Sequence, residues 1–210
     1  MNYIVFDLEW NIVGKKNKVS REEQERLPFE IIEIGAVKLD SKMQMDGNFS
    51  AYVQPKLYPV ISHYVARVTK RNQESLKLGK PFPEAAKAFH SFSANGKPVF
   101  CSWSKADPQV MIENLYYYDL EIFDPLYCLD VQTLFAVVGE KVRSSTQRSI
   151  EYALDYLNVP QGKPLHTALN DAYYTAKILQ ALWLELGDHS ASPAQALHEF
   201  LYQPSVKKRR

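Results

Sequence analysis

Short apolar runs separated by polar turns recur along the chain and predict a sheet. Residues 3–10, 30–39 and 48–54 are rich in β-branched and aromatic residues and follow one another without a helix, which predicts an antiparallel meander. Runs at residues 98–103 and 126–129 predict two further strands, each followed by a segment of helical periodicity. We therefore expect a mixed five-stranded sheet, an antiparallel meander and then parallel strands.

Apolar residues at steps of three and four predict helices that flank this sheet. The strongest such segment spans residues 167–185, and one stripe of it should face the sheet: Ala168, Asp171, Thr175, Ile178 and Leu182. Shorter helices are expected at residues 22–26, 61–78, 84–92, 107–117, 131–138, 149–157 and 192–201. The order of the elements predicts an α/β layered fold.

Composition narrows the class of protein. The 210 residues are 46% hydrophobic and carry a net charge of +1, so a polyanion would need local basic patches or bound metal ions. Cys101 and Cys128 lie in apolar runs and are expected to be reduced core residues of a cytoplasmic protein. Acids interrupt the N-terminal apolar run and residues 178–186 are too short to cross a bilayer, so neither a signal peptide nor a membrane span is expected.

Asp7 and Glu9 place two carboxylates on the first predicted strand. Side chains two residues apart on a strand share a face, roughly 6.5–7 Å apart along the backbone. Two buried carboxylates are costly unless protons or a cation offset their charge, and hard cations such as Mg²⁺ prefer oxygen ligands. The alternative is a strand that ends at Asp7 and leaves both acids in a solvated turn.

Three later residues fit the same chemistry. Asp107 follows the fourth predicted strand, where open α/β folds build sites, although capping of the next helix alone would explain it. Asp171 lies on the apolar stripe of the last helix, where a buried acid needs a cation; a solvated face is the alternative. His166 lies in the loop before that helix and could act as a general base, or could simply be exposed.

Taken in order, these residues resemble the motifs of the DEDDh exonucleases: Asp-Leu-Glu at residues 7–9, Asp107 after a strand ending in Ser-Trp, and His-Thr-Ala-Leu-Asn-Asp at residues 166–171. Residues 29–37 and 171–176 are also similar to that family, and the resemblance covers about residues 2–186. Residues 6–11 and 100–104 most resemble the KapD-type branch. That branch is related to the enhancer-of-RNA-interference exonucleases and is linked by name to inhibition of a sporulation-kinase pathway.

The resemblance implies a ribonuclease H-like exonuclease domain over residues 1–187, followed at residues 188–210 by an extension with a short helix and a basic tail. It implies a 3′→5′ exonuclease that releases nucleoside 5′-monophosphates from single-stranded 3′ ends, RNA favoured over DNA. The alternatives are a DNA-trimming exonuclease and a regulatory binding protein that uses the exonuclease scaffold to inhibit a signalling partner.

By the same resemblance, two Mg²⁺ or Mn²⁺ ions would be held by four carboxylates, those of Asp7, Glu9, Asp107 and Asp171. Asp7 would bridge the ions, and His166 would take a proton from the attacking water.

The terminal nucleotide would lie against the residues after Glu9 and the segment 65–73, with Trp10 stacked on a base or, alternatively, packed in the core. Many family members have a Leu-Thr-Gly-Ile-like run where this chain has Val-Thr-Lys-Arg at residues 68–71. Thr69, Lys70 and Arg71 are therefore candidate substrate contacts; the two cations could instead form an ordinary solvated face.

Overall fold

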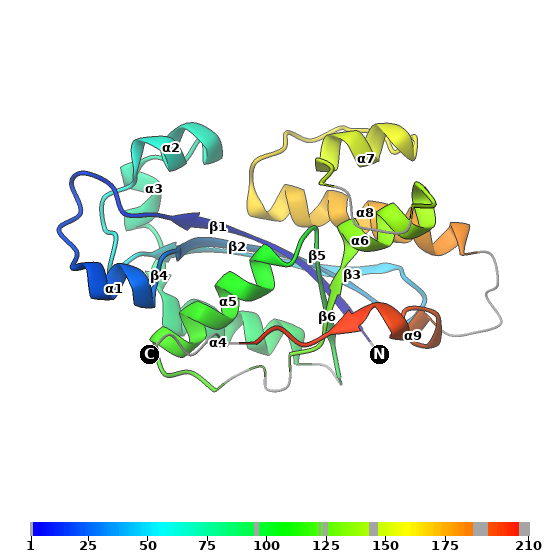
Figure 1. Ribbon diagram of the computed structural model, residues 1–210, viewed down its shortest axis with the longest axis horizontal. Coiled ribbons are helices and arrows are strands. Elements are labelled where there is room, and N and C mark those ends of the chain that lie inside the picture. The colour runs from blue at the N-terminus through cyan, green and yellow to red at the C-terminus, as the bar shows by residue number, and fades with distance from the viewer. Residues whose placement is uncertain are drawn as a thin grey trace.

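The computed structural model describes residues 2–94, 97–121, 123, 126–142, 147–186 and 193–205. Helices cover both faces of one mixed sheet (Figure 1). Within the described residues the sheet has seven strands in the order β4-β3-β2-β1-β5-β6-β7. The predicted α/β class is confirmed, and the expected count of five strands is wrong.

Five strands correspond to the predicted runs: β1 (Tyr3–Asn11), β2 (Glu30–Leu39), β3 (Met45–Gln54), β5 (Val99–Ser102) and β6 (Cys128–Asp130). Strands β1, β2 and β3 are antiparallel neighbours, whereas β5 is parallel to β1 and β6 is parallel to β5. The additional strands are β4 (Lys80–Pro81), parallel to β3, and β7 (Leu201–Tyr202), antiparallel to β6. Each has two residues, too few to show a periodicity.

The helices follow the predicted segments: α1 (Arg21–Arg26), α2 (His63–Thr69), α3 (Gln73–Lys77), α4 (Phe82–Ser93), α5 (Ala106–Tyr117), α6 (Val131–Leu134), α7 (Ile150–Tyr156), α8 (Ala168–Glu185) and α9 (Pro193–Ala196). A π-helical turn, Phe135–Gly139, continues α6, and a 3-10 turn, His198–Phe200, follows α9. No helix among the described residues is long and apolar enough to cross a membrane.

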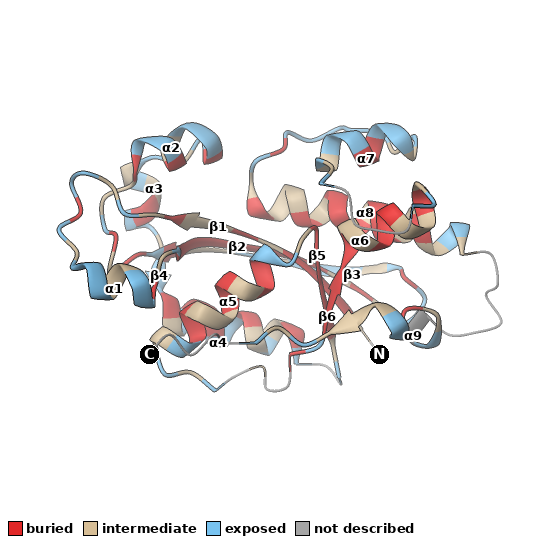
Figure 2. Cartoon of the chain, in the orientation of Figure 1, coloured by how far each residue is buried: buried red, intermediate tan, exposed pale blue. Residues whose placement is uncertain are grey.

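Strand β1 lies at the centre of two hydrophobic cores because its alternate side chains enter opposite faces of the sheet. Tyr3 and Val5 pack with residues of α6 and α8, while Ile4 and Phe6 pack with residues of α4 and α5. Figure 2 shows the burial concentrated along the central strands and on the sheet-facing side of α8. Both cysteines are buried and unpaired with each other.

Gly35 allows α8 to begin directly on the sheet. A Cβ atom at this position of β2 would overlap backbone atoms of Ala168 and Leu169, in the first turn of α8. Helix α8 therefore approaches β2 more closely than any other residue type at position 35 would permit. The buried positions on its stripe are Ala168, Thr175, Ile178 and Leu182, as the periodicity predicts.

The last described residues return to the sheet through β7. The basic tail at residues 207–210 and the expected boundary near residue 187 lie outside the described residues.

Candidate functional site

Three carboxylates converge beyond the middle of β1. Asp7 and Glu9 lie on the same side of this strand, and Asp171 lies in the first turn of α8. One carboxylate oxygen from each residue lies within 4.8 Å of the others. Asp171 reaches the strand because Gly35 lets the start of α8 rest on β2. The group offers a hard divalent cation the oxygen ligands that it prefers.

Asp107 brings a fourth carboxylate beside this group, although it is not one of the three that lie within 4.8 Å of one another. It lies in the first turn of α5 and is only 5% exposed. Its Oδ1 accepts a hydrogen bond of 3.1 Å from the backbone N–H of Leu8, between Asp7 and Glu9 on β1. The alternative that Asp107 only caps its helix is wrong, because the N-cap is Lys105 and the Asp107 carboxylate binds a backbone N–H of β1.

The four carboxylates perturb one another. Burial, followed by repulsion from Asp107 and Asp171, raises the pKa of Asp7 well above its usual value. Burial is also the main cause that raises the pKa of Glu9 to about 8, of Asp107 to about 7 and of Asp171 to about 6. Removing water and crowding like charges both disfavour ionisation, so bound cations would relieve this site.

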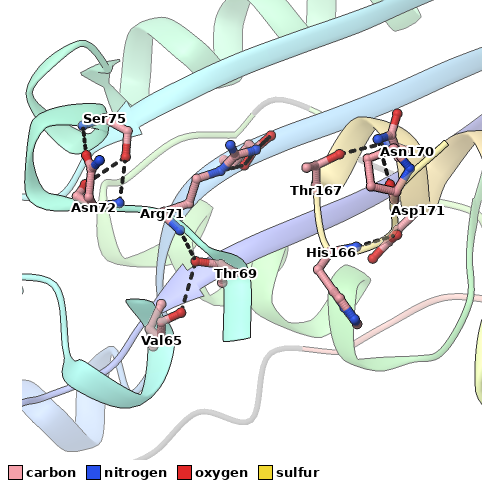
Figure 3. A network of polar contacts seen from close by, with 11 residues as sticks. Val65, Thr69, Arg71, Asn72, Ser75, His166, Thr167, Asn170 and Asp171 are labelled. Atoms are coloured by element: carbon pink, nitrogen blue, oxygen red, sulfur yellow. Dashed lines mark hydrogen bonds and ion pairs between the residues drawn. The ribbon is translucent and has the colours of Figure 1, made fainter. Parts of the chain in front are cut away.

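His166 lies beside Asp171 but is exposed. Its φ is 71°, and its backbone N–H donates a 3.1 Å hydrogen bond to Asp171 Oδ1. Figure 3 shows the imidazole extending away from Asp171 and from α8. Both residues line a pocket of about 230 Å³ with Trp103, Arg148, Ser149, Ile150, Glu151 and Leu165. The backbone of His166 thus orients the Asp171 carboxylate and leaves the ring free.

An ion pair between Glu33 and Arg71 lies next to Glu9. Glu33, on β2, lies opposite Glu9 in the sheet and is 2% exposed. Arg71 donates to both of its oxygens, from Nε to Oε2 and from Nη2 to Oε1, each at 2.8 Å. Arg71 is therefore not part of an ordinary solvated face. Sequence reasoning gave Glu33 no role, although an acid in a strand as apolar as β2 signals a buried partner.

The other candidate substrate residues surround the same end of β1. Thr69 is buried; its hydroxyl donates to Val65 O at 2.9 Å and accepts from Arg71 N–H at 3.1 Å. Lys70 is exposed and has a left-handed backbone, with φ 55°, at the end of α2. Trp10 is partly buried, with its ring 5.8 Å from that of Phe29. In Figure 3 the Thr69–Arg71 segment lies at the left of the view and His166 at the right.

Known structures share this fold. The nuclease domain of 3′hExo, described as a DEDDh family member bound to rAMP, is 18% identical; the match covers 89% of this chain and 92% of that one, with a TM-score of 0.71. Cell-death related nuclease 4 is 17% identical, with 89% of this chain and 64% of that one covered and a TM-score of 0.71. Escherichia coli exonuclease I, in complex with a dA16 oligonucleotide, is 15% identical. The match covers 88% of this chain and 41% of that one, with a TM-score of 0.69.

A search of curated protein sequences gave no significant match. The sequence model of the exonuclease (RNase_T) family, however, matches residues 4–179, most of the chain and all four of the clustered carboxylates. The chain belongs to the exonuclease family.

Proposed function

We propose that this protein is a divalent-metal-dependent 3′→5′ exonuclease that acts on single-stranded ends, with RNA favoured over DNA. The observation that carries the proposal is the convergence of Asp7, Glu9 and Asp171 within 4.8 Å, with Asp107 hydrogen-bonded to the same strand. These residues come from β1, α5 and α8. One of these acids is buried and three are half-buried, so holding them together is costly unless protons or cations offset their charge.

The donor set fits Mg²⁺ or Mn²⁺. Asp7, Glu9, Asp107 and Asp171 supply only oxygen ligands, and burial raises the pKa of each above its ordinary value. Two such ions, when bound, would stabilise the charge on the attacking and leaving oxygens of a phosphodiester. Asp7 is repelled by each of the other three carboxylates, so it would help to hold either ion.

The surrounding residues orient the carboxylates and accept a proton. His166 presents an exposed imidazole beside Asp171, in reach of a pocket where a water could enter, and an imidazole nitrogen would take the proton of that water. The backbone of His166 fixes Asp171, and the backbone of Leu8 fixes Asp107. The product would be a nucleoside 5′-monophosphate.

The exposed face of α2 suits a single strand. Its exposed side chains combine cations, an aromatic ring and an aliphatic residue: His63, Tyr64, Arg67, Val68 and, just beyond the helix, Lys70. Cations track phosphates while rings stack on bases, which is how single strands are held without sequence readout. The preference for RNA rests on the resemblance to the KapD-type branch and on neighbours of the same fold, one of which is described as recognising a histone mRNA stem-loop.

The test uses 5′-labelled RNA and DNA oligonucleotides of matched sequence, with Mn²⁺, Mg²⁺ or chelator. We expect shortening in single-nucleotide steps that chelator and Asp7→Asn both abolish, and slower shortening of a strand with a 3′-phosphate. Faster shortening of DNA would reverse the proposed preference. Oligonucleotides that stay at full length with every metal would contradict the proposal and favour a regulatory binding protein on this scaffold.

A further inference from the structure

Glu33 lies next to the proposed cation site and is nevertheless bound to another partner. It pairs with Glu9 across β1 and β2, yet it is not part of the group formed by Asp7, Glu9 and Asp171. Both of its oxygens accept hydrogen bonds from Arg71, and the carboxylate also accepts from the backbone N–H of Ala168. Its strongest lone-pair directions are therefore already used.

Arg71 is held firmly in this arrangement. Its side chain is 18% exposed, and its guanidinium carbon lies 5.1 Å from the centre of the Tyr52 ring. Its backbone N–H donates to the hydroxyl of Thr69, the last residue of α2 (Figure 3). The ion pair thus connects the end of α2 to β2 beside the carboxylates.

The other end of α2 is tied to β1. Asn11, the last residue of that strand, accepts from the N–H of Ser62 at 3.0 Å and donates to Tyr58 O at 2.8 Å. Ser62 is the N-cap of α2, where its hydroxyl accepts from Val65 N–H. Helix α2 is therefore anchored at its start by Asn11 and at its end by Arg71, so a change at Arg71 would loosen one end only.

The charges show what the ion pair does for the site. Five carboxylates act on one another here: Asp7, Glu9, Glu33, Asp107 and Asp171. The positive charge of Arg71 offsets one of them, leaving the negative charge that two divalent cations would balance. Without Arg71, the carboxylate of Glu33 would be a fifth anionic ligand adjacent to Glu9.

We propose that Arg71 is a positioning residue that keeps Glu33 out of the divalent-cation site and, through the same ion pair, fixes the end of α2 beside it. The inference rests on the proposed function, because it assumes that cations bind the carboxylates.

The decisive measurement is Mn²⁺ binding by calorimetry on the full chain, in a double-mutant cycle. Arg71→Ile frees Glu33 and should tighten Mn²⁺ binding by about tenfold, since one more buried charge faces the cation. Glu33→Gln leaves Arg71 as an unopposed cation and should weaken binding. The double variant Arg71→Ile/Glu33→Gln should bind Mn²⁺ as the wild type does.

Two variants act as controls. Lys77→Ile removes the cation of an exposed ion pair with Glu74 on α3, and Mn²⁺ binding should not change. Arg71→Lys keeps the charge and loses the paired hydrogen bonds, so it should show a smaller effect of the same sign. If Arg71→Ile does not fold, Arg71→Lys is compared with Arg71→Lys/Glu33→Gln in its place.

The outcomes separate the two proposals. An effect of the Arg71 substitution that is the same with glutamate and with glutamine at position 33 would overturn the inference, because Glu33 would then not carry it. An unchanged Mn²⁺ affinity in Arg71→Ile would overturn it as well. A wild-type chain that binds no Mn²⁺ would instead contradict the proposed function. Hydrogen exchange at residues 63–71 provides the second readout and should quicken in Arg71→Ile.

Discussion

The backbone N–H of Leu8 donates a 3.1 Å hydrogen bond to Oδ1 of Asp107, 99 residues later in the chain. This bond holds the start of α5 against β1 and points one buried carboxylate at Asp7. It also allows the electrostatic and structural roles of Asp107 to be separated by experiment.

Asp107→Asn keeps an oxygen that can accept from Leu8 N–H, so the fold should persist. Activity should fall on the order of 10²-fold or more, because the substitution removes one preorganised negative charge from the site. Asp107→Ala leaves the buried N–H unpaired and should cost about 1–3 kcal/mol as well. Chemical denaturation and oligonucleotide shortening check the two effects. Equal unfolding free energies for both variants would show that the hydrogen bond contributes nothing.

The stability of the metal-free protein should fall as pH rises. The folded-state pKa is raised to about 6 for Asp171, about 7 for Asp107 and about 8 for Glu9, whereas unfolded carboxyls titrate near about 4. The folded state therefore holds protons that the unfolded state releases. The stabilisation is present below about pH 4 and is lost as pH rises through these values.

Thermal melting in chelator from pH 5 to 9 measures this loss. Mn²⁺ should restore stability, with a larger gain at pH 8 than at pH 6, because bound cations replace the protons. Asp7→Asn removes one charge from the group and should flatten the pH dependence. A melting temperature that is independent of pH and of Mn²⁺ would contradict the prediction.

His166→Asn should reduce turnover by about 10²–10⁴-fold, the usual contribution of a general base. Asparagine tolerates the left-handed backbone of this position and keeps the backbone N–H that binds Asp171. Mn²⁺ affinity should therefore not change, which single-turnover kinetics combined with calorimetry would show. The exposed His198 provides a matched control, since His198→Asn should leave both quantities unchanged.

Gly35→Ala should damage both stability and cation binding. The added methyl group would overlap the backbone at the start of α8 and displace Asp171, with a cost of about 1–3 kcal/mol for overpacking. Gly162→Ala is the control, because a Cβ there meets no atom within 4 Å and should change stability by less than about 0.5 kcal/mol. Similar melting temperatures for the two variants would argue against the close approach of α8.

Lys70→Gly should stabilise the protein by about 1 kcal/mol, since glycine adopts the left-handed backbone at φ 55° without a steric penalty. If Lys70 also contacts a phosphate, the salt dependence of oligonucleotide binding should become shallower by about one unit of slope. Fluorescence anisotropy at several salt concentrations measures it. An unchanged slope would remove Lys70 from the proposed substrate contacts.

Much of the fold could be predicted from local pattern. Strands β1, β2 and β3 carry enough alternating or apolar residues to be identified, and the stripe on α8 gave its sheet-facing side. Strands β4 and β7 could not be found, since each exists only because a neighbouring strand offers an edge. Short strands depend on tertiary contacts, which the local sequence does not encode.

The candidate site could also be predicted only in part. The shared face of Asp7 and Glu9 follows from strand geometry alone, and the order of the motifs suggested Asp107 and Asp171 as partners. The helix-start motif at Asp107 admitted a capping role that the structure excludes, because the N-cap is Lys105, two residues earlier than the pattern implies. The Arg71–Glu33 pair could not be anticipated, since it depends on the path that residues 55–71 take around the end of β1.

Strand β7 bears on how the protein could be shortened. The family match ends at residue 179, so a truncation soon after α8 would keep the whole matched region. It would, however, strip the antiparallel partner from β6 and leave the peptide groups of Cys128 and Leu129 without the neighbours that they have in the full chain. Exposed edge strands pair with other chains, so the shortened protein should self-associate even with its clustered acids intact.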